Sequence, residues 1–188
     1  MPITALDPKA ALIVVDLQKG IVGSAPTVHP AAEIVQRASL LAAAFRRHGL
    51  PVVLVNVAGR APGRNEQSLP AGGARPTDWA DLVPELNRQP EDHTVTKQTW
   101  GAFTNTDLAE YLKTRGVTQV VLAGIATSIG VESTARQAHE LGLNVTLSID
   151  AMTDTNAEMH AISTRHVFPR LGETGTSAEI IALLDKRA

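Results

Sequence analysis

Short apolar runs alternate along the chain with longer stretches in which apolar residues recur every three or four positions. The runs are rich in Val, Ile and Leu without strict polar alternation, which is typical of strands covered on both faces of a parallel sheet. Strands are therefore predicted at 11–15, 51–57, 93–96, 117–123, 143–149 and 168–171, the third and the last from weaker patterns.

The stretches between these runs have the spacing of helices. The first of them follows Pro30 and stops before Gly49, as helix start and stop signals require. Thr106 is expected to cap the second helix, and Thr155 with Glu158 has the pattern of a capping box for the fourth. Helices are predicted over 31–47, 106–115, 129–141, 155–166 and 177–186.

This alternation of strands and helices predicts right-handed β-α-β crossovers and a doubly wound α/β sheet with helices on both faces. Residues 58–89 are rich in Gly, Pro, Ala and Arg without a clear period. A loop of this length in a compact domain is usually a lid or a binding loop. The chain of 188 residues is 44% hydrophobic and has no internal repeat, so residues 1–188 are predicted to form a single domain.

The composition excludes several classes of function. The formal net charge is −2 and no long run of like charges occurs, so neither nucleic acid nor an anionic membrane is expected as a partner. No apolar stretch approaches the ~18 residues that a membrane span needs, and the first ten residues lack the pattern of a signal peptide. We therefore expect a cytoplasmic protein. Because the chain contains no cysteine, disulfides, thiolate zinc sites and thiolate catalysis are excluded.

No metal and no cofactor are expected. The six histidines include no pair spaced by four residues, and we expect them, His160 among them, at the surface or at helix ends. The chain also lacks the glycine-rich signatures of nucleotide-binding loops.

Chemically useful groups gather at the carboxyl ends of the predicted strands, where open parallel sheets bind their ligands. Asp16 ends the first strand, Lys97 ends the third, and the turn at 124–130 follows the fourth. Each residue alone is more typical of a cap or a solvated charge, but their arrival at one edge indicates a site. Lys97 would favour the ionised form of Asp16, whereas a cleft of low polarity would favour the neutral acid. Amides at the start of the helix that follows could bind a carboxylate or an oxyanion.

Three segments in this order resemble the motifs of the isochorismatase-like hydrolases. They are Val14-Val15-Asp16-Leu17-Gln18, Lys97-Gln98-Thr99-Trp100-Gly101-Ala102-Phe103 and Gly124-Ile125-Ala126-Thr127-Ser128-Ile129-Gly130-Val131-Glu132-Ser133-Thr134-Ala135-Arg136. The similarity extends from about residue 10 to residue 185. It implies a six-stranded parallel sheet in the order 3-2-1-4-5-6. Family members commonly form dimers or tetramers, so the resemblance also implies a homodimer or a homotetramer.

The resemblance implies a catalytic group of Asp16, Lys97 and Gly130, where Gly130 stands at the position of the family's nucleophilic cysteine. It also implies a cis peptide bond before Ala126 that directs the amides of Ala126 and Gly130 at an oxyanion. Without a thiol, the thioester route of the family's amidases is not available. The isochorismatases lack this cysteine too: their Asp protonates a vinyl ether, and water adds to the resulting oxocarbenium ion.

We therefore expect a cofactor-independent hydrolase of a small anionic substrate, with Asp16 as general acid or base and Lys97 as its electrostatic partner. The alternative is a small-molecule binding or scaffold protein that lost catalysis with the nucleophile. Ser128 is the better of the substitute nucleophiles, but no histidine base lies near it in sequence. Isochorismatases have Tyr and His at the positions of Ala126 and Ser128, so isochorismate itself is not expected as the substrate. The expected pocket residues are Gln18, Asn56, Trp100, Phe103, Thr127 and Ser128.

Overall fold

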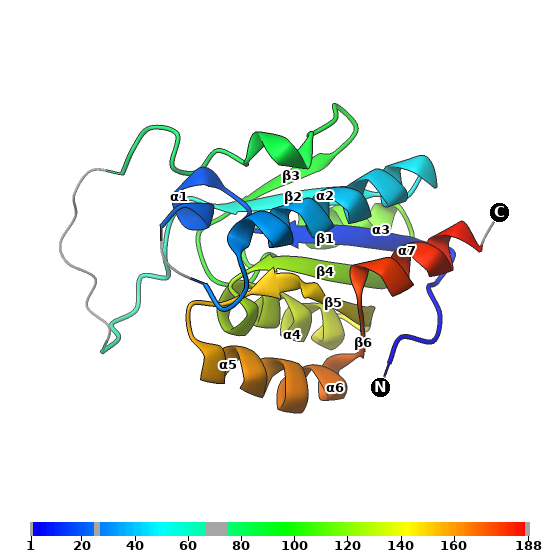
Figure 1. Ribbon diagram of the computed structural model, residues 1–188. Coiled ribbons are helices and arrows are strands. Elements are labelled where there is room, and N and C mark those ends of the chain that lie inside the picture. Colours follow the sequence, from blue (N-terminus) through cyan, green and yellow to red (C-terminus); the bar gives the residue numbers. More distant parts are fainter. Residues whose placement is uncertain (1, 25–26, 67–74, 187–188) are drawn as a thin grey trace.

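A single parallel sheet forms the centre of the molecule in a computed structural model that describes residues 2–24, 27–66 and 75–186. The strand order is β3-β2-β1-β4-β5-β6 (Figure 1), which confirms the predicted doubly wound α/β fold. The strands are β1 (Ala10–Val15), β2 (Val52–Val57), β3 (His93–Lys97), β4 (Gln119–Ile125), β5 (Asn144–Thr153) and β6 (Glu173–Gly175).

Helices cover both faces of this sheet (Figure 1). One face packs against α2 and α7, and the other against α3, α4 and α6. The α-helices are α1 (Lys19–Val22), α2 (Ala31–Arg47), α3 (Leu108–Thr114), α4 (Glu132–Glu140), α5 (Ala157–Ile162), α6 (Phe168–Leu171) and α7 (Ser177–Asp185). A 3₁₀ turn, η1 (Pro84–Leu86), and two π-helical turns, η2 (Thr127–Val131) and η3 (Ser163–Val167), complete the described elements. None of the helices in the described ranges is long and apolar enough to cross a membrane.

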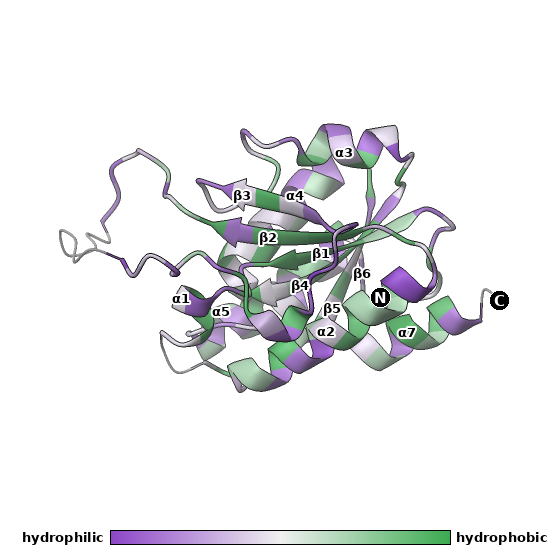
Figure 2. Ribbon diagram, turned by 90° about the horizontal axis from the view of Figure 1, so that it is seen from above, coloured by the Kyte–Doolittle hydropathy of each residue, from purple (hydrophilic) through white to green (hydrophobic). Residues whose placement is uncertain are grey.

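The core consists of two layers that share the central strand β1. All six residues of β1 are buried, and alternate side chains enter opposite layers. Leu12 and Val14 pack on the side of α2, whereas Ile13 and Val15 pack on the side of α4. β1 and β2 are accordingly hydrophobic along most of their length (Figure 2). This two-sided burial explains why the strand sequences do not alternate with polar residues.

The prediction for residues 168–171 is wrong, because this segment forms the short helix α6 and the last strand is β6. Pro169 lies in the first turn of α6, where its missing amide hydrogen costs no hydrogen bond. Phe168 is fully buried in the core, so the apolar pattern that suggested a strand reflects helix packing.

The predicted helix starts are also corrected in three places. The capping box at Thr155 does not form, since the fourth helix begins after Asn156, whose side chain accepts from the Met159 amide. A capping box does form at Thr176, the residue before α7. The second helix begins at Leu108, two residues later than predicted. The third begins as the π-helical turn η2 and continues regularly as α4.

Candidate active site

Asp16 and Lys97 form a buried ion pair at the carboxyl edge of the sheet. Asp16 directly follows β1, Lys97 is the last residue of β3, and β2 lies between these strands. The distance from Lys97 Nζ to Asp16 Oδ2 is 2.7 Å, and the two residues are 2% and 4% exposed. Asp16 has a positive φ of 56°, which Asp tolerates better than most residues. The sequence prediction that these two residues meet at one edge therefore agrees with their geometry.

The carboxyl group of Asp16 is only partly satisfied. Lys97 donates to Oδ2, but the buried Oδ1 has no hydrogen-bond partner among the described residues. Burial raises the pKa of Asp16 from 3.8 to about 6, and the opposing effect of the Lys97 charge and hydrogen bond is smaller. Lys97 Nζ also donates to the carbonyl oxygen of Thr99 at 3.1 Å. Two protein oxygens thus hold the ammonium in place.

The turn after β4 lies directly against this pair. It begins with a cis peptide bond between Ile125 and Ala126, as the resemblance implied, and continues as η2. A Cβ atom built on Gly130 would lie 3.2 Å from Asp16 Oδ2, 3.1 Å from Val15 Cγ1 and 3.6 Å from the Trp100 carbonyl oxygen. Gly130 is thus placed against Asp16, and the absence of a side chain keeps this contact from becoming crowded.

Several backbone amides of the turn are already engaged within the protein. Those of Ile129 and Val131 donate to the Ala126 carbonyl oxygen. The Ser128 amide donates to Asp154 Oδ2 at 2.8 Å, and the Ser128 hydroxyl donates to the same oxygen at 2.7 Å. A carboxylate of the chain itself therefore occupies the amide of Ser128. The anion-binding role of the Ala126 and Gly130 amides stays a prediction.

Thr127 has a partner that the sequence did not reveal. Its hydroxyl lies 2.9 Å from Nδ1 of His160 on α5, and the Thr127 residue is completely buried. His160 in turn meets His29 edge to face, with ring centroids 5.2 Å apart. The expectation that His160 has only a surface or capping role is therefore wrong. The predicted pocket residues Thr127 and Ser128 both use their hydroxyl groups for contacts within the protein.

Gln18 and Asn56 also use their side chains to hold the backbone. Gln18 is fully buried, accepts from the Val57 amide at 2.7 Å and donates to the carbonyl oxygens of Val57 and Trp79. Asn56 donates to the Ala80 carbonyl oxygen. These contacts tie β2 to the segment around residue 80 and occupy the side-chain amide of Gln18, and the substrate-pocket role of Gln18 and Asn56 stays a prediction.

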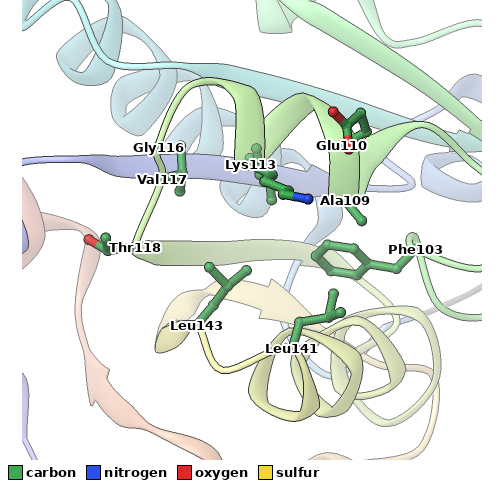
Figure 3. A pocket seen from close by; sticks show the side chains of 10 residues that line it. Phe103, Ala109, Glu110, Lys113, Gly116, Val117, Thr118, Leu141 and Leu143 are labelled. Carbon is green, nitrogen blue, oxygen red and sulfur yellow. The ribbon is translucent and has the colours of Figure 1, made fainter.

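The two aromatic residues after Lys97 lie in different surroundings. The Trp100 residue is 62% exposed, and its carbonyl oxygen is close to Gly130. Phe103 instead packs against the core layer of α3 and α4 and lines a groove between these helices with Leu141 and Leu143 (Figure 3). The structure therefore brings the backbone of Trp100, and not the ring of Phe103, to the candidate site.

The residues that sequence reasoning missed are Thr99, Asp154 and His160. Asp154 directly follows β5, as Asp16 follows β1, so its position at a strand end was a signal that could have been used. Thr99 contributes through its carbonyl oxygen, which any residue type supplies. His160 reaches the turn across a contact between α5 and η2 that no local pattern indicates. Within the described ranges, no cluster of three or more His, Asp or Glu side chains could hold a metal ion.

Comparisons with known proteins identify the family of this chain. The sequence profile of the isochorismatase domain matches residues 10–179. The isochorismatase family protein YwoC of Bacillus subtilis is 42% identical over 179 residues, which cover 92% of this chain and 93% of YwoC. YecD of Escherichia coli O157:H7 is 41% identical over 179 residues, covering 93% of this chain and 95% of YecD.

A solved structure has the same fold. The isochorismatase family protein of Burkholderia thailandensis superimposes with a TM-score of 0.90 at 39% identity, covering 96% of this chain and 98% of that one. The chain therefore belongs to the isochorismatase family of hydrolases, in the subgroup that has glycine in place of the nucleophilic cysteine.

Proposed function

We propose that this protein hydrolyses a vinyl ether in a small anionic substrate, without a cofactor or a covalent intermediate, with Asp16 as the general acid. The observation that carries the proposal is the Asp16 carboxyl group. It is buried, its pKa is raised to about 6, and its Oδ1 has no partner among the described residues. A carboxyl group with this pKa can hold a proton close to neutral pH and transfer it, as general acid catalysis requires.

In the proposed reaction the enol ether is first protonated, and water then adds to the product of that step. Asp16 transfers its proton to the outer carbon of the enol ether, which leaves an oxocarbenium ion. Water adds to this ion, and the adduct breaks its carbon–oxygen bond to release an alcohol and a carbonyl compound. The proton lost by the water returns to the carboxylate of Asp16. Lys97 stabilises that carboxylate between the two transfers.

The test compares the wild type with Asp16→Asn on a panel of vinyl ethers, amides and ureido compounds, followed by mass spectrometry. We expect the wild type to convert a vinyl ether and Asp16→Asn to be slower by at least ~10²-fold. Asp81→Asn is the matched control, because it removes a carboxylate from an exposed pair with Lys19. Its turnover is expected to equal that of the wild type.

The pH dependence of the same reaction separates an acid from a base. If Asp16 acts as the acid, kcat/KM is constant below about 6 and falls tenfold per pH unit above it. The opposite slope would assign Asp16 as a base. Equal turnover by wild type and Asp16→Asn would contradict the proposal. If neither protein converts any compound but a compound raises the Tm of both, the alternative of a binding protein is favoured.

A further inference from the structure

A second group of polar side chains lies on the candidate turn and has no part in the proposed reaction. It consists of Thr127 in η2, His160 in α5 and His29 in the segment before α2. Thr127 Oγ1 and His160 Nδ1 are 2.9 Å apart, and the imidazole of His160 contacts the ring of His29. Because Thr127 is completely buried, its hydroxyl cannot exchange this partner for water without movement of the turn.

The hydrogen bonds anchor one end of the turn. Thr127 and Ser128 are the first two residues of η2, and they are held by His160 and Asp154 respectively. Gly130 is the fourth residue, and it faces Asp16. A displacement of the anchored end would therefore change how closely the turn covers the Asp16 carboxyl group, whose raised pKa depends on that burial.

The surroundings of His160 favour its neutral form. Burial lowers the pKa of His160 first, and the neighbouring His29 lowers it further, while Asp154 acts weakly in the opposite direction. A further acidic side chain, Glu132 of α4, accepts from the Ser163 hydroxyl and pairs with an exposed arginine of its own helix. In a neutral imidazole with its proton on Nε2, Nδ1 can accept a hydrogen bond from the Thr127 hydroxyl.

We propose that His160 is a positioning residue for the candidate active site: its hydrogen bond to Thr127 fixes the turn that sets Gly130 against Asp16. His160 acts through Thr127 and does not touch the substrate. Its relevance to turnover rests on the proposed function, but its effect on the turn does not, and the two can be measured separately.

The test follows the pKa of the Asp16 carboxyl group by ¹³C NMR, which needs no substrate. His160→Leu removes the hydrogen bond, and we expect the pKa of Asp16 to fall from about 6 by roughly one or more, toward its ordinary value of 3.8. His160→Asn is the conservative variant, because its Oδ1 takes the place of Nδ1 and can accept from Thr127. It should keep the pKa of Asp16 where the wild type has it.

Two further variants make the result decisive. Thr127→Val deletes the same hydrogen bond by replacing the Thr127 hydroxyl with a methyl group, so it takes the place of His160→Leu if that variant does not fold. His139→Asn, at an exposed histidine of α4, is the control for a His-to-Asn change in a helix. It should leave the pKa of Asp16 unchanged.

An unchanged Asp16 pKa in folded His160→Leu or Thr127→Val would overturn the proposal, and so would an equal change in His160→Asn. With the substrate found by the screen, His160→Leu should lose turnover by about tenfold or more. If instead Asp16→Asn is fully active, the proposed function fails while the NMR result for His160 still stands.

Discussion

At Gly130 the backbone conformation does not require glycine, but the neighbouring side chains leave little room for a Cβ atom. Its φ lies outside the left-handed region, yet a Cβ atom there would approach Val15 Cγ1 to 3.1 Å and Asp16 Oδ2 to 3.2 Å. Alanine would gain ~1 kcal/mol of helix propensity but would crowd two groups in a close-packed region, which typically costs about 1–3 kcal/mol. We expect Gly130→Ala to fold, to be less stable by ~1 kcal/mol, and to lose turnover by about tenfold or more because the methyl group blocks approach to Asp16.

The control for this substitution is Gly63→Ala. At Gly63 no atom of the described residues lies within 4 Å of the position that an added methyl group would take, and φ is not left-handed, so alanine should leave both the Tm and the turnover unchanged. Thermal unfolding and the turnover assay are measured on both variants. An active Gly130→Ala would show that the space beside Gly130 is not used by the substrate.

Among the elements, β1 and β4 leave no room for a side chain at one point. Gly124 has a φ of 128°, and a Cβ atom on it would collide with the backbone nitrogen and carbonyl oxygen of Val15. Since both strands are central in the sheet, neither backbone can move away without breaking other pairings. We expect Gly124→Ala to lower the free energy of unfolding by about 3 kcal/mol or more, measured by urea denaturation.

A second glycine distinguishes the stability cost of the clash with Val15 from the cost of a positive φ. Gly142 also has a positive φ, of 79°, but within the described ranges no atom lies within 4 Å of its added Cβ. Gly142→Ala should therefore cost only the ~1–2 kcal/mol of a left-handed residue. If the two variants lose equal stability, the contact with Val15 is not what requires glycine at position 124.

Strands such as β1 and β4 were predictable because two-sided burial leaves a clear mark on the sequence, whereas the strand order followed only from the family resemblance. Boundaries were less predictable where tertiary contacts decide. Phe168 belongs to a helix because it packs into the core there, and the hydrophobic pattern of residues 168–171 cannot distinguish this from a short strand. The π-helical start of the helix at η2 likewise has no propensity signal.

The candidate site was likewise predictable only in part. Asp16 and Lys97 followed from the rule that polar residues at the carboxyl ends of parallel strands meet at one edge. Gln18 shows the limit of that rule, since a side chain two residues beyond a strand can turn back to bind the backbone. The bond between His160 and Thr127 depends on where α5 docks, and docking is a property of the packed molecule.

The free energy of unfolding of the whole molecule should depend on pH through Asp16, because a group with different pKa values in the folded and unfolded states makes stability depend on pH. The folded-state pKa of about 6 lies above the unfolded value of 3.8, so the folded protein binds this proton more tightly. The contribution of Asp16 to the free energy of unfolding is on the order of 3 kcal/mol. It is fully present below pH 3.8 and is lost as the pH rises through about 6. His160 contributes the opposite slope, since its lowered pKa removes stability as the pH falls below 6.5.

The difference between wild type and Asp16→Asn cancels the contributions of His160 and of the other groups that do not contact Asp16, and therefore reports on Asp16 together with its ion-pair partner Lys97. We expect the free energy of unfolding of the wild type, relative to that of Asp16→Asn, to fall by about 2 kcal/mol between pH 4 and pH 7, since part of the total is already lost at pH 4. Urea denaturation at pH steps of half a unit measures it. A difference that stays constant would mean that Asp16 is ionised throughout this range and that Lys97, and not burial, dominates its pKa. In that case Asp16 would not be protonated near neutral pH and could not act as the general acid. The measurement therefore tests the proposed role of Asp16 even while the substrate is unidentified.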